Sequence, residues 1–223
     1  FVDVPIDKLI DKKYLKFRSN KLETKLKIPE IKPGSIFQRE TNSYIYANSL
    51  ELPSTTHISI ADKYGNALSM TSTIESSFGS RLMTNGGFLL NNELTDFSFQ
   101  KERKGKRVAN NIEPNKRPRS SMAPTIIFKN DKPLFIIGSP GGSNIIGYVV
   151  NSIIGLVDWK MNVQQAASIP HGINKFGTFY LEKNSKISLL KKQLEKKGYK
   201  VKLRNFYSGL NIIQIKNNLF GGS

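Results

Sequence analysis

Residues 54–62 read Ser-Thr-Thr-His-Ile-Ser-Ile-Ala-Asp and begin the most regular part of the chain. In this run Ile58 and Ile60 alternate with polar neighbours, which is the pattern of a half-buried strand. Residues 63–66, Lys-Tyr-Gly-Asn, supply a turn, and residues 67–74, Ala-Leu-Ser-Met-Thr-Ser-Thr-Ile, alternate again. The stretch therefore predicts a β-hairpin around which the rest of the chain is organised.

The predicted hairpin brings hydroxyl groups from its two strands together. Thr55 opens the first strand, whereas Thr71 and Thr73 lie late in the second. A hydroxyl that faces a second hydroxyl across the ladder can serve as a nucleophile with its orienting group. Thr is also an ordinary strand residue, so the hairpin by itself favours a purely structural role.

The composition indicates a folded domain with a large excess of positive charge. The chain has 223 residues, 38% of them hydrophobic, and a formal net charge of +17. This charge suggests nucleic-acid binding, but Lys is spread over nearly every segment, and the densest run, residues 101–107, has only Phe99 nearby for base stacking. A solvated basic face is therefore favoured. No segment approaches the ~18 apolar residues of a membrane helix.

Residue counts limit metal and thiol chemistry. The absence of Cys excludes disulfides, thiolate metal sites and a Cys nucleophile. Two histidines, His57 and His171, make a His-rich zinc site improbable. We therefore expect neither a metal site nor a cofactor.

The segments on either side of the hairpin are more polar. Apolar residues at near-helical spacing after Pro5 predict one amphipathic helix to about residue 19. Residues 28–54 have the composition of a linker. After the hairpin, Phe88-Leu89-Leu90 predicts a short buried strand that delivers Glu93 and Asp96 into a turn. That acidic pair alone is consistent with ordinary turn chemistry, and residues 99–119 follow as a basic loop without periodicity.

The second half of the chain predicts a layered α+β sandwich. Residues 125–129 and 134–138 are apolar runs typical of strands buried on both faces. Ser143 can cap the apolar helix that follows. Backbone N–H groups of Gly141 and Gly142 lie before that helix, at the positive end of its dipole, which suits a developing oxyanion. A tight structural turn is the alternative, and it is favoured in isolation. Further elements are expected at residues 162–168 (helix), 178–182 (strand), 185–198 (helix capped by Ser185), 200–204 and 210–216 (strands).

Several dispersed motifs together resemble the gamma-glutamyltranspeptidase family, in order and with similar spacing. They are Thr55–Ser59, Asp62–Ala67, Phe78-Gly79-Ser80, Leu89–Glu93 with Asp96-Phe97-Ser98, Pro118 with Ser120-Ser121-Met122, and Gly138–Ser143. The resemblance covers nearly the whole chain. Residues 1–54 resemble the end of the large subunit, and residues 55–223 a small, catalytic subunit without its last stretch. It implies an N-terminal nucleophile hydrolase fold, a four-layer αββα sandwich, here incomplete at both ends.

The resemblance also implies a mechanism. The precursor would cut itself between Ser54 and Thr55, and Thr55 would then supply both the attacking hydroxyl and an α-amine base with a reference pKa of about 7.7–8.0. Thr73 matches the residue whose hydroxyl contacts the nucleophile, and Gly141 and Gly142 match the oxyanion hole. The implied substrate is glutathione or another γ-glutamyl compound. Its acyl group passes to Thr55 and then to water, an amino acid or a peptide.

Recognition of the substrate head follows from the same resemblance. Ser120 and Ser121 match the residues that hold its α-carboxylate, and Glu93 and Asp96 match those that hold its α-ammonium. Glu75 stands beside the ammonium site, where well-studied members have Asn. This departure, and the short basic loop at 99–119, leave open a related acylase acting on glutaryl or cephalosporin-type amides.

The resemblance finally implies partners and a location. The small-subunit part is expected to form a heterodimer with the remainder of the large subunit, which supplies an Arg for the α-carboxylate. The location expected by resemblance is the periplasm or the exterior of a bacterium.

Overall fold

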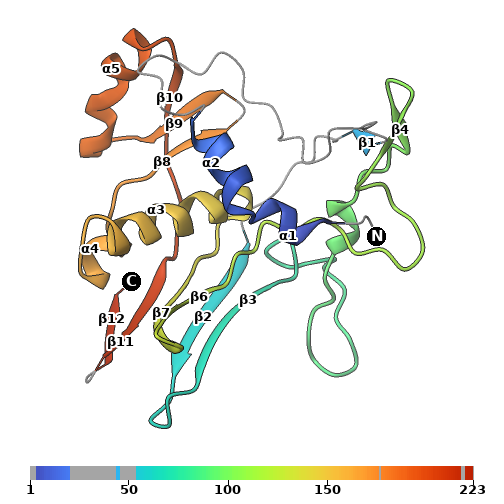
Figure 1. The fold of residues 1–223 in the computed structure, drawn as a ribbon. Coiled ribbons are helices and arrows are strands. Elements are labelled where there is room, and N and C mark those ends of the chain that lie inside the picture. The colour runs from blue at the N-terminus through green and yellow to red at the C-terminus, as the bar shows by residue number, and fades with distance from the viewer. Residues whose placement is uncertain (1–3, 21–43, 46–53, 176, 217–218, 223) are drawn as a thin grey trace. The chain divides into compact units, whose positions relative to one another are not determined.

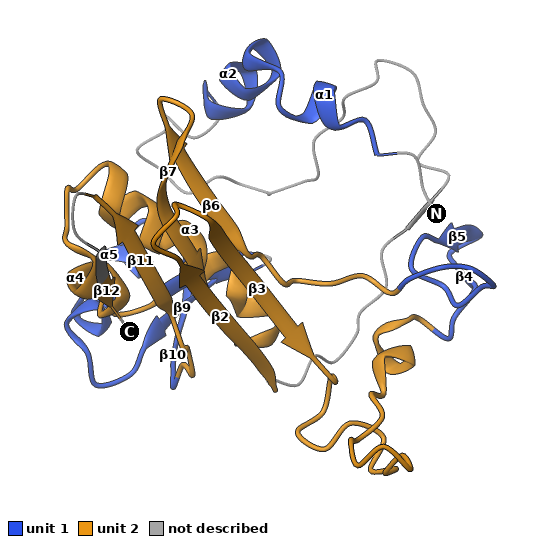
Figure 2. Ribbon diagram, turned by 90° about the horizontal axis from the view of Figure 1, so that it is seen from below, with its two compact units in different colours: residues 1–47, 99–117, 172–205 blue, residues 48–98, 118–171, 206–223 orange. Residues whose placement is uncertain are grey.

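The structure is a computed structural model that describes residues 4–20, 44–45, 54–175, 177–216 and 219–222. The chain divides into two compact units (Figure 2). The first comprises residues 1–47, 99–117 and 172–205, and the second comprises residues 48–98, 118–171 and 206–223. Most of the predicted linker, residues 28–54, lies outside the described residues.

The second unit is built on a four-stranded sheet with the order β12-β11-β7-β6. Strands β6 (Thr125–Lys129), β7 (Lys132–Gly138), β11 (Asn211–Ile215) and β12 (Leu219–Gly222) pair antiparallel throughout. The first three confirm strands expected from the sequence. Burial on both faces is confirmed for the last four residues of β7 but is wrong for β6, where Phe128 is 59% exposed.

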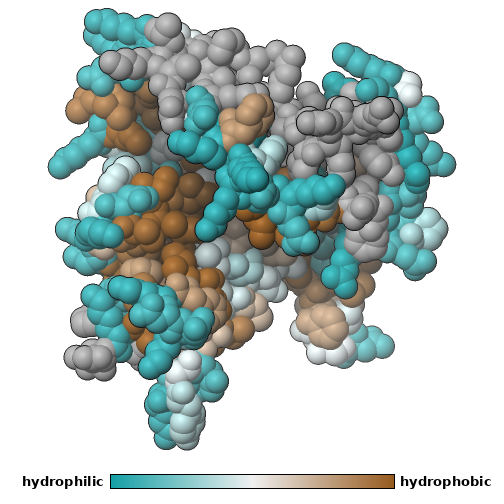
Figure 3. Space-filling view, in the orientation of Figure 1, coloured by the Kyte–Doolittle hydropathy of each residue, from teal (hydrophilic) through white to brown (hydrophobic). Residues whose placement is uncertain are grey.

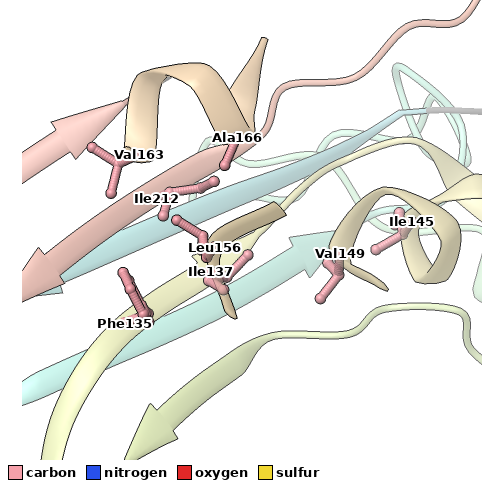
Figure 4. Close-up of a cluster of buried hydrophobic side chains, with 8 residues drawn as sticks. All are labelled: Phe135, Ile137, Ile145, Val149, Leu156, Val163, Ala166 and Ile212. Carbon is pink, nitrogen blue, oxygen red and sulfur yellow. The ribbon is translucent and has the colours of Figure 1, made fainter. Parts of the chain in front are cut away.

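Two helices cover one face of this sheet, α3 (Ile145–Val157) and α4 (Val163–Ala167). The side chains between helices and sheet form the main core (Figure 4), with members Phe135, Ile137, Ile145, Val149, Leu156, Val163, Ala166 and Ile212. The 13 residues of α3 are apolar nearly all round, because Ile146, Val150 and Val157 remain exposed on its outer side. Figure 3 shows apolar surface gathered where α3 lies in Figure 1.

The helix starts differ in part from the prediction. Asn162 caps α4 through a capping box with Gln165, at the helix expected there. The predicted cap at Ser143 is wrong, because a 3-10 turn, η2 (Gly142–Asn144), precedes α3 and contains Ser143. No described helix is long and apolar enough to cross a lipid bilayer.

The predicted hairpin lies on the opposite face of the sheet. Strands β2 (Thr55–Ala61) and β3 (Ala67–Thr73) pair antiparallel, with Thr55 opposite Thr73. Ser69 Oγ donates to the Ile137 carbonyl oxygen at 3.0 Å. A Cβ on Gly138 would lie 2.0 Å from the ring of His57. Since Ile137 points toward the helices and Gly138 is the next residue, the hairpin packs on the side that Gly138 faces.

The hairpin turns its small and polar side chains inward and its apolar side chains outward. Ile58, Ile60, Leu68 and Met70 are 40–48% exposed, and these four residues are called the apolar hairpin face below. The inward side carries Thr, Ser, Ala and His residues of both strands. An antiparallel sheet with one solvated face normally has the opposite arrangement. The apolar hairpin face therefore has the chemistry of a covered surface.

The segment after the hairpin corrects one expectation. Phe88-Leu89-Leu90 is not a buried strand: Leu89 forms a single bridge with Met83, and Phe88 is 62% exposed. The backbone of Leu90 instead lies so close to Gly79 that a Cβ there would meet the Leu90 oxygen at 2.1 Å. The acidic pair is delivered by a 3-10 turn, η1 (Glu93–Asp96).

The first unit contains two small sheets. In one, β9 (Thr178–Glu182) pairs antiparallel with β8 (Gly172–Lys175) and parallel with β10 (Lys200–Arg204). The helix expected after Ser185 is a 3-10 turn, η3 (Lys186–Leu190), followed by α5 (Lys191–Lys196), and the Ser185 hydroxyl caps neither because it donates to the Glu182 oxygen. The other sheet joins β1 (Tyr44–Ile45), β5 (Lys106–Val108) and β4 (Glu102–Arg103). Residues 99–119 are therefore not wholly irregular.

The N-terminal helix is split. Residues form α1 (Ile6–Leu9) and α2 (Lys12–Asn20) rather than one helix. The cause is Asp11, whose Oδ1 accepts the Tyr14 N–H at 2.8 Å and so begins a new helix.

His57 is the titratable group of the hairpin–sheet contact. Its Nδ1 lies 2.8 Å from Thr71 Oγ1 and its Nε2 3.0 Å from Ser59 Oγ. Burial lowers the pKa of His57 from 6.5. The unfolded chain therefore binds this proton more readily, so the stability contributed is complete above the unfolded pKa and is lost as the pH falls below it, toward the folded pKa.

We expect an NMR titration of the two histidines to give His57 a pKa below 6.5, and acidification through that range to destabilise the protein. Substitution His57→Gln, which keeps hydrogen-bonding capacity, should remove this part of the pH dependence. A pKa of His57 at or above that of an unfolded peptide would contradict the packing described.

Candidate active site

One pocket of the second unit collects residues from separate parts of its sequence. It encloses about 390 Å³, counting the space at its mouth, which lies in the range of about 300–1,000 Å³ usual for small-molecule sites. The lining residues are Thr55, Thr73, Glu75, Glu93, Asp96, Ser120, Ser121, Met122, Gly142 and Ile145. Every site residue predicted from the sequence lines this pocket except Gly141, which adjoins Gly142.

The two threonines occupy the open end of the hairpin. Thr55 begins β2 and is the direct pairing partner of Thr73, the last residue of β3. The backbone N–H of Glu75 donates to Thr73 Oγ1 at 3.0 Å. A hydroxyl that accepts one hydrogen bond can still donate its own hydrogen. The pocket wall thus presents one hydroxyl beside a second one with a fixed acceptor side.

The glycine pair forms a turn that only glycine fits easily. Gly141 has φ +136° and Gly142 φ +56°. A Cβ on Gly141 would lie 2.5 Å from Cε2 of Tyr148, a fully buried residue of α3 whose ring stacks 4.2 Å from that of His171. The chain then enters η2 and α3, whose first N–H groups lack partners within the helix and carry the positive end of its dipole. Gly142 and Ile145 bring this end to the pocket.

Glu75 lies deep in the opposite, acidic part of the lining. It is 8% exposed and has a positive φ of 71°. Its Oε2 accepts hydrogen bonds from Ser76 Oγ, at 2.7 Å, and from Asn92 Nδ2. Asn92 also accepts the Ser76 N–H at 3.0 Å, so it ties the end of β3 to η1. The sequence gave Asn92 only as part of a motif, without a role in the site.

Glu93 carries an unsatisfied oxygen in the same pocket. Its Oε1 is buried and accepts no hydrogen bond from the described residues. Burial raises the pKa of Glu93, and the nearby Asp96 and Glu75 raise it further. A buried acceptor without a donor is costly, so this part of the pocket is suited to a cationic hydrogen-bond donor.

Ser120 and Ser121 give the pocket a second kind of polar surface. Ser120 Oγ accepts the Met122 N–H at 3.2 Å, which fixes the hydroxyl in the segment before β6. Hydroxyls can donate to a carboxylate, whereas the acids can accept from an ammonium group. The pocket therefore has separate groups for the two charges of a zwitterion.

His57 escaped the sequence-based list of site residues. It lies two residues after Thr55 on the same side of β2 and contacts Gly138, at the end of the strand that leads to Gly141. The available signal was its period-2 spacing from Thr55, which places both residues on the inward side of the strand.

Comparison with known proteins agrees with these features. The sequence pattern of the gamma-glutamyltranspeptidase family matches residues 1–223. A glutathione hydrolase proenzyme of Bacillus subtilis is 38% identical over 177 residues, or 76% of this chain and 29% of that protein. The Escherichia coli glutathione hydrolase proenzyme is 34% identical over 100% of this chain and 38% of its own length. An acylase proenzyme of a Pseudomonas species is 32% identical over 82% of this chain and 30% of its own length.

Solved structures give the same picture. A mutant of Helicobacter pylori gamma-glutamyltranspeptidase is 39% identical, with a TM-score of 0.68 over 75% of this chain and 97% of that chain. A cephalosporin acylase from Bacillus halodurans matches 100% of this chain and 38% of its own, with a TM-score of 0.77 and 21% identity, and supports the mixed α+β fold alone. This chain spans 29–38% of the length of the two glutathione hydrolase proenzymes.

The glycine turn yields a test. Substitution Gly141→Ala should lower the turnover of a γ-glutamyl anilide by about 10²–10³-fold, the usual loss on removing one oxyanion donor, because the new Cβ forces the turn away from Tyr148. The matched control is Gly65→Ala, which also has positive φ, +91°, but has no atom within 4 Å of the new Cβ. Equal losses in the two variants would contradict a specific role for the turn.

Proposed function

This chain belongs to the gamma-glutamyltranspeptidase family, and on that premise we propose that it transfers γ-glutamyl groups through a covalent Thr55 ester after cleaving itself between Ser54 and Thr55. The observation that carries the proposal is the shared pocket of Thr55, Gly142, the acids and the two serines. Glutathione and other γ-glutamyl compounds are the proposed donors, and water, amino acids or short peptides are the proposed acceptors.

Self-cleavage would come first. Thr55 Oγ attacks the carbonyl carbon of Ser54, the peptide C–N bond breaks, and an ester links Ser54 to the Thr55 oxygen. Water then hydrolyses that ester, leaving a carboxylate on Ser54 and a free α-amine on Thr55. The description of the curated relatives as proenzymes supports this step.

Turnover would use the new chain start. The α-amine accepts the Thr55 hydroxyl proton as the oxygen attacks the γ-carbonyl carbon of the substrate. Backbone N–H groups at Gly141 and Gly142 stabilise the tetrahedral oxyanion. The proton passes to the departing amine as the C–N bond breaks, and the acyl group stays on Thr55 until water or an acceptor amine attacks it.

The Thr73 hydroxyl would orient this attack. Its oxygen already accepts the Glu75 N–H, so its hydrogen is available for the Thr55 oxygen opposite it in the ladder. Orientation of the nucleophile in this way lowers the entropy to be lost in reaching the transition state.

Recognition would use the two polar surfaces of the pocket. Ser120 and Ser121 donate to the α-carboxylate of the γ-glutamyl group, and Glu93 and Asp96 accept from its α-ammonium. Hydrogen bonds between charged groups are about twice as strong as neutral ones. A related acylase that accepts glutaryl amides is the second candidate, supported by the acylase relative. The acids rank it lower, because a glutaryl group lacks the ammonium that they would hold.

We further propose that the apolar hairpin face is covered by the remainder of the large subunit, which would complete the four-layer αββα sandwich. The described part of the second unit contributes α3 and α4, the four-stranded sheet, and the hairpin. The relatives are two to three times longer than their match to this chain, so they contain ample sequence for a further layer.

The apolar hairpin face gives a test in the full-length, processed enzyme. Ile58→Ala should destabilise the assembly by about 2–5 kcal/mol if the side chain is buried against the partner, measured as a lower denaturant midpoint for subunit dissociation. Tyr64→Ala in the turn of the same hairpin, 78% exposed, is the control and should have little effect. An unchanged midpoint for Ile58→Ala would rule out coverage of this face.

The proposed chemistry is tested at Thr55. Thr55→Ala in the full-length protein should give one uncut chain with no turnover, because the attacking oxygen is gone. Thr56→Ala, which alters the exposed neighbour, should still yield two chains, one beginning at Thr55. Gel electrophoresis with N-terminal sequencing reads both. Cleavage in the Thr55→Ala protein would sink the mechanism.

A further inference from the structure

Building on the function proposed above, we propose that Glu75 sets the charge selectivity of the pocket: it is the third carboxylate around the substrate head, and it couples entry of a cationic head to release of a proton. The substrate class implied is an amide whose acyl part carries an α-ammonium group. Amides of the same length without that group are disfavoured.

The backbone of Glu75 argues that the side chain is retained for function. Glu75 combines a φ of +71° with an exposure of only 8%. Side chains other than Gly, Asn and Asp are costly in the left-handed region, and a buried carboxylate adds a desolvation cost. Outliers of this kind gather at functional sites. Fold stability alone favours Gly or Asn at such a position.

The contacts of Glu75 fix its carboxylate without neutralising it. Oε2 accepts from Ser76 Oγ and Asn92 Nδ2, and both donors are uncharged. Asn92 is itself held by its donation to Ser76 Oγ, at 3.1 Å, and to Thr95 Oγ1, at 3.2 Å. The negative charge therefore stays in the pocket wall in a defined position.

Glu93 faces that charge from another element. Its buried Oε1 accepts no hydrogen bond from the described residues, and its pKa is raised by burial, by Asp96 on the same turn and by Glu75. The charged side chains that line the pocket are these three acids, and the α-amine of Thr55 joins them after cleavage. Arg119 precedes Ser120 in sequence but is exposed and does not line the pocket.

Three carboxylates in one small pocket cannot all ionise easily, because like charges disfavour one another. A proton is therefore held among them, chiefly on Glu93, until a cation arrives. An entering ammonium favours the ionised form and expels the proton. Among the described residues no acidic group is arranged to hold a metal ion, so the cation that fits is an organic ammonium.

The test uses full-length, self-processed enzyme with two substrates, γ-glutamyl p-nitroanilide and glutaryl p-nitroanilide. Glu75→Gln keeps the size of the side chain and an oxygen for Asn92 but removes the charge. We expect the ratio of kcat/KM for the γ-glutamyl over the glutaryl substrate to fall about tenfold. The change should fall on KM rather than kcat, because Glu75 binds the head and does not touch the reacting atoms.

The pH dependence gives a second, signed readout. In the parent enzyme, KM for the γ-glutamyl substrate should rise on acidification, because protons compete with the ammonium, whereas KM for the glutaryl substrate should fall. Glu75→Gln removes one cause of the raised Glu93 pKa, so the rise in KM should move to lower pH. A merely structural role of Glu75 predicts no such shift.

Two further variants complete the design. Asp131→Asn removes a carboxylate from the exposed β6–β7 turn, outside the pocket, and should leave the substrate ratio and the pH profile unchanged. Glu75→Asn suits the left-handed backbone better, so it should keep the thermal midpoint of the parent or raise it while losing selectivity.

The outcomes separate the two levels of the proposal. Turnover of the γ-glutamyl substrate with an unchanged ratio and pH profile in Glu75→Gln would overturn the role of Glu75 and leave the proposed function standing. Absence of turnover and of self-cleavage in the parent enzyme would overturn both.

Discussion

The close contact between the β2–β3 hairpin and the four-stranded sheet is the constraint on which the rest of the structure depends. It works because the inward residues are small or hydrogen-bonded: Ser69 bonds to the Ile137 oxygen, and the imidazole of His57 fits against Gly138. Larger apolar residues on this side would separate the two layers. The contact fixes Thr55 relative to β7, whose continuation forms the Gly141–Gly142 turn, so packing between strands sets the distance between the two sides of the pocket.

The pocket gathers its chemistry at places where the backbone is unusual. Gly141, Gly142 and Glu75 all have positive φ, and each stands directly after a strand that the contact holds in place. Regular strands supply rigidity, and the irregular residues after them direct N–H groups and a carboxylate into one space. A single buried amide, Asn92, joins the acids on η1 to the end of β3.

Local patterns in the sequence predicted the elements better than their surroundings. The hairpin and its register could be predicted, because period-2 alternation and a turn at residues 63–66 leave one pairing, with Thr55 opposite Thr73. Which side faces the core could not, since hydrophobicity points to Ile58 and Met70 and the structure buries the opposite side. Phe88-Leu89-Leu90 was misjudged for a related reason: apolar residues imply burial only where a partner surface exists. Asp11 was a visible helix-start signal that the apolar spacing around it obscured. The nine site residues were predicted through resemblance, because their meeting depends on pairings between distant segments; the structure brings them to one pocket, while their roles stay predictions.

The register of the first strand has a consequence for the chemistry proposed at its start. Chain ends are normally the most mobile part of a domain. Here the residue that becomes the new end is already in the ladder, opposite Thr73, with six more paired positions behind it, from Thr56 to Ala61. Scission of the bond before it therefore releases an amine without releasing the strand. The terminus is anchored before it exists, and the reactive group inherits the order of a sheet interior rather than the disorder of a tail.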